Sequence, residues 1–183
     1  VSQASTRLLV RVDHALGGKD AEIKDAADFA LRTIIMTQYP SGGWSANFDD
    51  APTFPPPVEK YPIKPANYPQ DWPRKWPKDF SGCYVLNDNT HATLMSTLLL
   101  AWQLRGDVQY LEAAKRGGDF LLLAQMPDPQ PAWAQQYNAD MQPVWSRQFE
   151  PTAISGRESQ AAVWALLKLA AATGDKKYLA PVA

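Results

Sequence analysis

Cysteine, histidine and long apolar runs are scarce in this 183-residue sequence, and each shortage argues against a class of protein. The single Cys83 cannot form an internal disulfide, so no disulfide framework is expected. His14 and His91 have no H-x-x-x-H or cysteine companions, which disfavours a zinc site. No run of about eighteen apolar residues occurs, so no membrane-spanning helix is predicted.

An excess of either charge sign is also missing. Eighteen basic and 19 acidic residues give a formal net charge of −1. The sequence has neither a polybasic footprint nor an acidic tail, so nucleic acid and membrane are not expected partners. The first residues lack the basic start and apolar segment of a signal peptide, as a mature secreted chain also would. The hydrophobic share of 45% is ordinary for one globular domain with a core.

Most of the chain has the apolar spacing of amphipathic helices, and no segment keeps the two-residue alternation of a strand. We predict helices over residues 4–16, 20–38, 90–105, 108–125 and 157–173. The last helix is expected to begin with a capping box, in which Ser155 caps and Glu158 lies three residues on. The predicted fold class is therefore all-α.

The helices are joined by a repeated turn in which Gly ends one helix and Asp begins the next. This turn occurs in "LGGKDAEI" (16–23), "LRGDVQYLEAA" (104–114) and "ATGDKKYLA" (172–180). Two of the helices that follow lead into similar passages, "QYPSGGW" (38–44) and "QMPDPQPAW" (125–133). Repeated helical hairpins stack into arrays or rings, which predicts an (α/α) toroid with long loops at one end. The third hairpin reaches only the start of its second helix, so residues 1–183 are expected to form roughly half to two-thirds of the toroid.

Fifteen of the 16 prolines lie in two long stretches, 39–87 and 127–156, which also hold many aromatic and charged residues. Rings interleaved with cations and carboxylates suit an acidic sugar chain. A tryptophan in such a loop nevertheless more often fastens the loop to the helices than contacts a ligand. Asp49 and Asp50 more often cap or turn than bind metal. The basic group at 74–78 is most often a solvated face.

Residues 86–95, "LNDNTHATLM", allow two interpretations of Asp88. Asp, Asn and Thr just before a helix are typical capping residues. Hard cations such as Ca²⁺ also bind Asp and Asn oxygens, although they need several ligands. The pattern alone leaves both interpretations open.

Four motifs in order resemble the pectic acid lyases, the pectate lyases of polysaccharide lyase family ten. They are "QYPSGGW", "YVLNDNTHATLM", "PAWAQQYNADMQPVWSRQFEP" and "SGRES". The resemblance implies an (α/α) toroid that cleaves polygalacturonate by β-elimination with Ca²⁺, in a secreted or periplasmic bacterial enzyme. It further implies the following roles: Arg147 as catalytic base, Asp88 as metal ligand, and Trp44, Asp88, Tyr137, Trp145 and Arg157 as substrate-binding residues.

The chain departs from the family pattern in several places. A further family aspartate would lie before Val1, and later substrate-binding arginines would lie beyond Ala183. Tyr137 stands where many members have His, and Leu86 replaces an aromatic residue. An arginine base is chemically unusual, so Arg147 could instead act as an electrostatic clamp. Asn89 or Thr90 is expected to cap the helix and leave Asp88 free to face the cleft.

Two other functions remain open. The first is a glycoside hydrolase on the same toroid, with Asp88 paired with Asp140 or Glu150. The second is a non-catalytic member that binds acidic polysaccharide.

Overall fold

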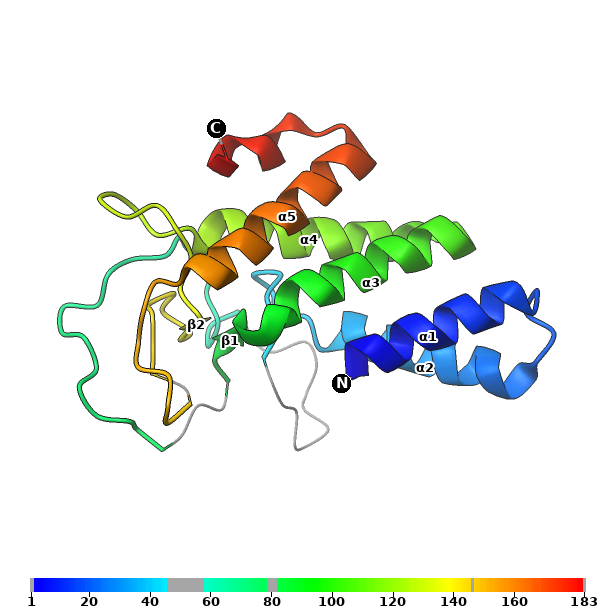
Figure 1. Cartoon of the computed structure of the whole chain (residues 1–183), viewed down its shortest axis with the longest axis horizontal. Helices are drawn as coiled ribbons and strands as arrows, with labels where there is room; N and C mark the ends of the chain where they lie inside the picture. The colour runs from blue at the N-terminus through cyan, green and yellow to red at the C-terminus, as the bar shows by residue number, and fades with distance from the viewer. Residues whose placement is uncertain (1, 46–57, 79–81, 146, 183) are drawn as a thin grey trace.

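The computed structural model describes residues 2–45, 58–78, 82–145 and 147–182, and these are mostly helical (Figure 1). Within these ranges the α-helices are α1 (Ser2–Ala15), α2 (Ala21–Met36), α3 (Thr90–Arg105), α4 (Val108–Ala124) and α5 (Gly156–Thr173). Two short 3-10 helices are η1 (Asn87–Asn89) and η2 (Lys176–Val182). Strands β1 (Tyr84–Val85) and β2 (Gln136–Tyr137) form one antiparallel pair. The five predicted helices and the all-α class are confirmed.

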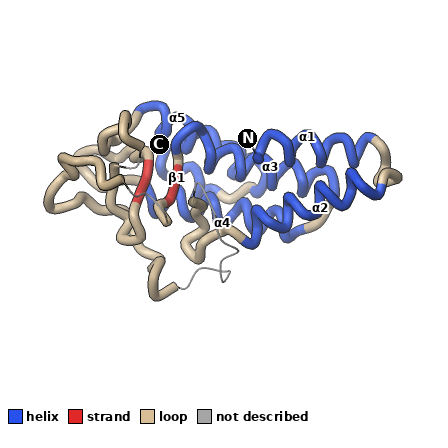
Figure 2. The backbone as a smooth tube through the Cα atoms, turned by 90° about the horizontal axis from the view of Figure 1, so that it is seen from below, coloured by secondary structure: helices blue, strands red, loops and turns tan. Residues whose placement is uncertain are grey.

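The helices lie in two layers that follow the repeat in the sequence. In one layer α3 packs between α1 and α5. In the other, α2 packs on α1, α4 on α3, and η2 on α5. The tight turns lie toward one end, and the long loops gather at the other (Figures 1 and 2). This is the arrangement of an (α/α) toroid. None of the helices among the described residues is long and apolar enough to cross a membrane.

The repeated Gly-Asp turns have the predicted geometry. Asp20, Asp107 and Asp175 each accept a hydrogen bond from a backbone N–H two or three residues later, at 3.1, 3.0 and 3.0 Å. Gly106 and Gly174 end their helices with φ of 74° and 71°, in the left-handed region that a Cβ disfavours. The turn chemistry therefore fixes where each hairpin reverses.

A tryptophan from each long loop closes the end of the preceding helix. The indole Nε1 of Trp44 donates to the carbonyl of Ile34 at 2.9 Å, and that of Trp133 donates to the carbonyl of Leu121 at 2.8 Å. Ile34 and Leu121 lie equally far along the chain from the aspartates that begin their helices. Because carbonyls in the last turn lack partners within the helix, these two capping tryptophans supply them.

The capping tryptophans also hold the far ends of their loops. The carbonyl of Trp44 accepts a hydrogen bond from the Val85 N–H at 3.0 Å, and the carbonyl of Trp133 accepts one from the Ser155 N–H at 2.9 Å. Val85 belongs to β1, and Ser155 directly precedes α5. The same backbone contact thus brings the two ends of each long loop together.

An ion cluster among three helices lies away from the long loops. Arg105 on α3 donates to Asp13 on α1 at 2.7 Å and also pairs with Asp28 on α2. Lys24 reaches the second oxygen of Asp28 at 2.8 Å. Only 11% of the Asp13 side chain and 17% of the Arg105 side chain are exposed. This cluster joins the first hairpin to the second.

His91 fills the space under the first long loop. Its ring lies 5.0 Å from that of Trp44 in an edge-on arrangement, and its Nε2 lies 2.9 Å from the carbonyl of Gly117. A carbonyl only accepts, so Nε2 carries the proton. Complete burial lowers the pKa of His91 to about 4, although the bond to Gly117 opposes the shift. His91 is a neutral core residue.

The predicted capping box at α5 is only partly present. Ser155 is the residue before the helix, but its side chain caps no backbone N–H. Its hydroxyl instead donates to the carboxylate of Glu158, which is buried. Because the Ser155 hydroxyl is drawn to this carboxylate, the prediction that it caps a helix N–H is wrong.

Candidate functional site

The N-D-N turn holds Asp88 and Asn89 in backbone conformations that few residues adopt. Their φ angles are 55° and 59°, both left-handed. Asp and Asn tolerate this region because their short polar side chains bond locally. Backbone strain of this kind clusters at functional sites. The Asp88 side chain remains 64% exposed and is available to a ligand.

The expectation that Asn89 caps α3 through its side chain is wrong. Asn89 occupies the cap position, but its side chain makes no capping hydrogen bond. The backbone N–H of Thr90 is satisfied by the carbonyl of Asn87. The cause is conformational, since a capping side chain requires an extended backbone that Asn89 does not have.

Arg147 lies between two carboxylates from different parts of the chain. Its Nη1 donates to Asp88 Oδ2 at 2.8 Å. Its Nε and Nη2 donate to the two oxygens of Glu150, each at 2.5 Å. The bond pair to Glu150 is bidentate, which fixes the plane of the guanidinium. Asp88 and Arg147, predicted as site residues, are therefore brought into contact.

The electrostatics keep Arg147 charged. The hydrogen bonds from Arg147 to Glu150 raise the pKa of the guanidinium, partial burial opposes this, and the Asp88 bond adds to it. A guanidinium between two carboxylates resists loss of a proton. This arrangement supports the electrostatic role that the sequence left open. The base role stays a prediction.

Two amide side chains position Glu150, and sequence reasoning assigned them no role. Asn87 Nδ2 donates to Glu150 Oε2 at 2.9 Å, and Gln136 donates to the Asn87 side-chain oxygen. Asn87 and Gln136 are buried, whereas Arg147 is partly exposed. The only signal in the sequence was that Asn87 flanks Asp88 and that Glu150 closes the "SRQFE" segment.

The structure corrects two predicted substrate-binding residues. Trp44 is 1% exposed, and its indole N–H donates to the Ile34 carbonyl of α2. Tyr137 is 0% exposed; its hydroxyl donates to the Ala124 carbonyl and accepts from the Ala134 N–H, both at 2.6 Å. A ring without exposed surface cannot stack on a sugar. Both residues fasten loops to helix ends.

Trp145 and Phe149 flank Arg147 in the chain. The indole N–H of Trp145 donates to the carbonyls of Arg147 and Gln148, at 2.9 and 3.2 Å, and so shapes the segment. Phe149 is 76% exposed, and its ring centroid lies 5.1 Å from the Arg147 guanidinium carbon. Phe149 is an exposed ring at the site that sequence reasoning missed. A direct contact of Trp145 with substrate stays a prediction.

A hollow of about 560 Å³ lies beside the N-D-N turn, between α1, α3 and α5. Asn89 contributes to its lining, and the predicted Arg157 lies in it. Its cations are Arg7, Arg157 and Lys168, and no carboxylate side chain lines it among the described residues. Trp164, 57% exposed, adds an aromatic face. The hollow is suited to an anionic ligand with apolar faces.

A metal would find few ligands from the chain alone. Asp88 offers one exposed carboxylate, a hard oxygen ligand of the kind that Ca²⁺ prefers. In the part of the chain that the structure describes, no three His, Cys, Asp or Glu side chains are grouped to hold a metal. Asp49 and Asp50 lie outside the described residues. Binding of Ca²⁺ by Asp88 therefore stays a prediction.

The fold and the site together define an all-α toroid of helical hairpins that carries a carboxylate-bound arginine and a cationic hollow at its long-loop end. The family model of pectic acid lyases matches residues 64–176, and the chain belongs to the pectic acid lyase family.

Two solved structures are similar to this chain, and no curated protein matches it. One is a family 10 polysaccharide lyase from Cellvibrio cellulosa, with a TM-score of 0.64 and 23% identity over 91% of this chain and 47% of that one. The other is a mutant of a family 10 polysaccharide lyase from the same organism, in complex with trigalacturonic acid. Its TM-score is 0.65, with 23% identity over 91% of this chain and 48% of the other. This chain thus spans about half the length of the structures it resembles.

Proposed function

We propose that residues 1–183 form part of the catalytic domain of a polysaccharide lyase. Its substrate would be polygalacturonate or a related uronic acid polysaccharide, cleaved by β-elimination. The observation that carries this proposal is the hollow lined by Arg7, Arg157 and Lys168 beside the Asp88–Arg147 contact. Three cations without a lining carboxylate suit the acid groups of such a polymer. Membership of the pectic acid lyase family supports the same reaction.

The chemistry requires a positive charge close to the uronate carboxylate. β-Elimination removes the proton at C5, forms the C4–C5 double bond and expels the oxygen at C4. Negative charge builds up on the carboxylate as the proton leaves, and a fixed cation stabilises it. Glu150 holds the Arg147 guanidinium in one plane, so that this charge is placed before substrate arrives. If Arg147 also accepts the proton, binding must first weaken its contacts with Glu150 and Asp88.

Ca²⁺ is the proposed cofactor, and Asp88 would hold it together with the sugar carboxylates and water. When bound, such a cation withdraws charge from the uronate carboxylate and makes the adjacent C–H more acidic. The residues of the chain keep separate tasks. Asp88 offers a ligand oxygen, and Arg157 and Lys168 neutralise neighbouring uronates in the hollow. A polymer of this kind is met outside the cytoplasm, so we propose a secreted or periplasmic location.

The test compares Arg147→Ala and Arg147→Lys with the native chain on polygalacturonate. Unsaturated uronate product is followed by the ultraviolet absorbance of its conjugated double bond. Arg147→Ala is expected to lower the rate by about 100-fold or more, as removal of a transition-state donor does. Arg32→Ala, which alters an exposed arginine on α2, is the matched control and is expected to be unchanged. A fully active Arg147→Ala variant removes Arg147 from the reaction.

Exhaustive chelation tests the cofactor separately. We expect turnover to stop in EDTA and to return when Ca²⁺ is added in excess. Full activity after chelation would contradict the role of Ca²⁺ and leave the arginine test intact.

The same assay distinguishes a lyase from a glycoside hydrolase. Asp88 and Glu150 contact one guanidinium, so two carboxylates do meet at the site, as a hydrolase needs. Asp140 is bound to Lys64 at 2.5 Å and takes no part in that contact. New reducing ends without the absorbing product would identify hydrolysis. Binding without either product would identify a non-catalytic member.

A further inference from the structure

A four-residue pattern in the first long loop has no part in the site described above. Residues 65–78 read "PANYPQDWPRKWPK", with prolines at every fourth position. The last three prolines follow Tyr68, Trp72 and Trp76. Proline fixes its own φ and disfavours the helical region for the residue before it. The pattern therefore spaces aromatic rings at regular intervals along a chain that cannot become a helix.

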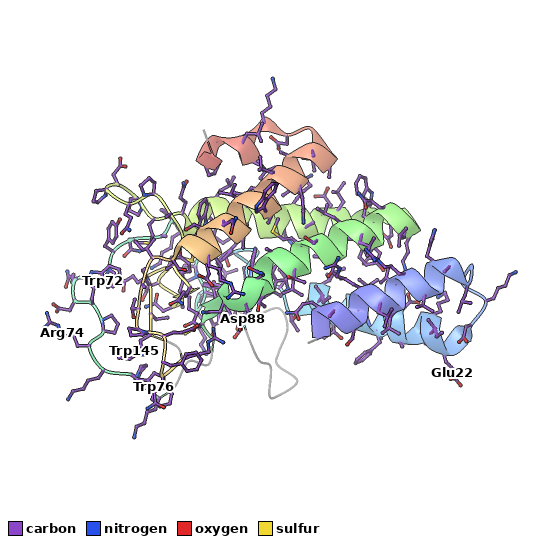
Figure 3. All side chains as sticks on the ribbon, viewed as in Figure 1. Glu22, Trp72, Arg74, Trp76, Asp88 and Trp145 are labelled. Atoms are coloured by element: carbon purple, nitrogen blue, oxygen red, sulfur yellow. The ribbon has the colours of Figure 1, made fainter. Side chains whose placement is uncertain are left out.

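We propose that residues 68–78, the aromatic arm, bind an acidic polysaccharide chain outside the catalytic site. The proposal rests on the proposed function for the choice of ligand. Figure 3 shows Trp72, Arg74 and Trp76 at the same end of the molecule as Trp145, with Glu22 at the opposite end and Asp88 toward the middle. On this proposal, a polymer bound at Asp88 and Arg147 extends over the aromatic arm, whereas a trimer occupies only the site.

The root of the aromatic arm is fixed to the core. The Ala66 N–H donates to the Leu123 carbonyl at 2.7 Å, in the last turn of α4. The hydroxyl of Tyr68 donates to the Pro127 carbonyl at 2.9 Å. The Trp72 ring lies 6.3 Å from the Tyr68 ring, and Trp72 is 41% exposed. A ring exposed on an anchored base offers a face to a sugar at little entropic cost.

The charge of the aromatic arm selects the class of ligand. Arg74, Lys75 and Lys78 are exposed, and Asp71 is the only acid within residues 68–78. Among the described residues, no carboxylate forms an ion pair with any of these three cations. Aromatic faces stack on sugar rings, and cations pair with uronate carboxylates. The sequence pI of about 6.1 argues against nucleic acid, whose binding domains are strongly basic.

The experiment measures binding of long and short ligands to a charge variant of the aromatic arm. Arg74, Lys75 and Lys78 are changed to Gln together, and polygalacturonate binding is measured by affinity electrophoresis. Three exposed ion pairs predict about tenfold weaker binding of the polymer. Trigalacturonate affinity, measured by calorimetry, is expected to stay within about twofold, because the trimer fills only the site. Raising the salt concentration should weaken polymer binding by the native chain more than by the variant.

A second triple variant controls for general charge. Lys19, Arg32 and Lys176, all exposed and outside the aromatic arm, are changed to Gln. This variant loses the same three charges and is expected to bind polymer as the native chain does. Trp72→Ala tests the ring separately, with weaker polymer binding, a native thermal midpoint and unchanged trimer affinity. All these measurements are repeated with single-stranded DNA as competitor.

Three results from the variants would overturn the proposal. They are native polymer affinity in the arm variant, equal loss in the control variant, and equal loss of trimer affinity. DNA that competes as well as polygalacturonate would also overturn it, in favour of a general anion surface. Arm-dependent binding in a chain that forms no lyase product would defeat only the proposed function. Lyase activity with arm-independent binding would defeat only the aromatic arm.

Discussion

Substitution of the capping tryptophans distinguishes rings that stabilise the fold from rings that bind ligand. Trp44→Phe and Trp133→Phe each remove one indole N–H from a buried helix-end carbonyl. An orphaned buried acceptor costs about 1–3 kcal/mol. The carbonyl of Ile34 keeps a second, longer bond from the Thr37 hydroxyl at 3.3 Å, so its loss is the smaller one.

The structure therefore orders the two effects. We expect Trp44→Phe to lower the free energy of unfolding by about 1–2 kcal/mol and Trp133→Phe by about 2–3 kcal/mol. For a chain of this size, these values correspond to falls in Tm of roughly 2–8 and 4–12 °C. Thermal unfolding followed by far-ultraviolet circular dichroism measures both. Calorimetric titration with trigalacturonate is expected to show native affinity for each variant.

Trp164→Phe is the matched control, since this ring is 57% exposed in the hollow. Its stability is expected to change by less than about 0.5 kcal/mol, while its affinity for trigalacturonate falls. A Trp44→Phe variant that melts like the native chain and loses affinity would refute the capping role of Trp44. That result would return Trp44 to the substrate-binding residues.

Three further predictions concern charge. Arg105→Met leaves the carboxylate of Asp13 buried without a partner and should lower the free energy of unfolding in urea by about 3–5 kcal/mol. Lys115→Met, which breaks the partly exposed pair with Glu112, should lower it by under about 1 kcal/mol. Burial lowers the pKa of His91 from 6.5 to about 4. The stability that the neutral His91 ring contributes to the fold is therefore complete above pH 6.5 and is lost as the pH falls to 4. The native chain should lose up to about 3 kcal/mol over that range relative to His91→Gln, and parallel pH curves would contradict this. Glu150→Gln weakens the bidentate bond to the site guanidinium and should lower kcat/KM at least about tenfold, whereas native kinetics would exclude a positioning role.

The helices and their turns could be predicted because their determinants are local. Asp20 and Asp107 cap helices through contacts within three residues, and the apolar spacing of each helix is continuous. The strained N-D-N turn was harder to predict from the sequence. A cluster of Asp, Asn and Thr predicts a side-chain cap, and only the φ angles at Asp88 and Asn89 show why the cap does not form.

The site could be predicted only in part because its contacts join distant segments. The resemblance to the family singled out Asp88 and Arg147, which do meet. An aromatic residue in a polar loop looks the same in sequence whether it stacks on a sugar or closes a helix end, so Trp44 and Tyr137 were misassigned. The bond from Gln136 to Asn87 depends on the β1–β2 pairing, which two-residue strands do not reveal.

The backbone bond between Trp44 and Val85 has a consequence for how the loops can change. It holds the two ends of residues 45–84 together, with 3.0 Å between carbonyl oxygen and amide nitrogen. Once the ends of a loop are joined, doubling its length costs only about 0.6 kcal/mol in closure entropy. Insertions between these two residues can therefore leave the helices and the N-D-N turn in place, so long as Tyr61 and Ala66 keep their buried positions in the core. New ligand preferences can arise there without rebuilding the reaction centre.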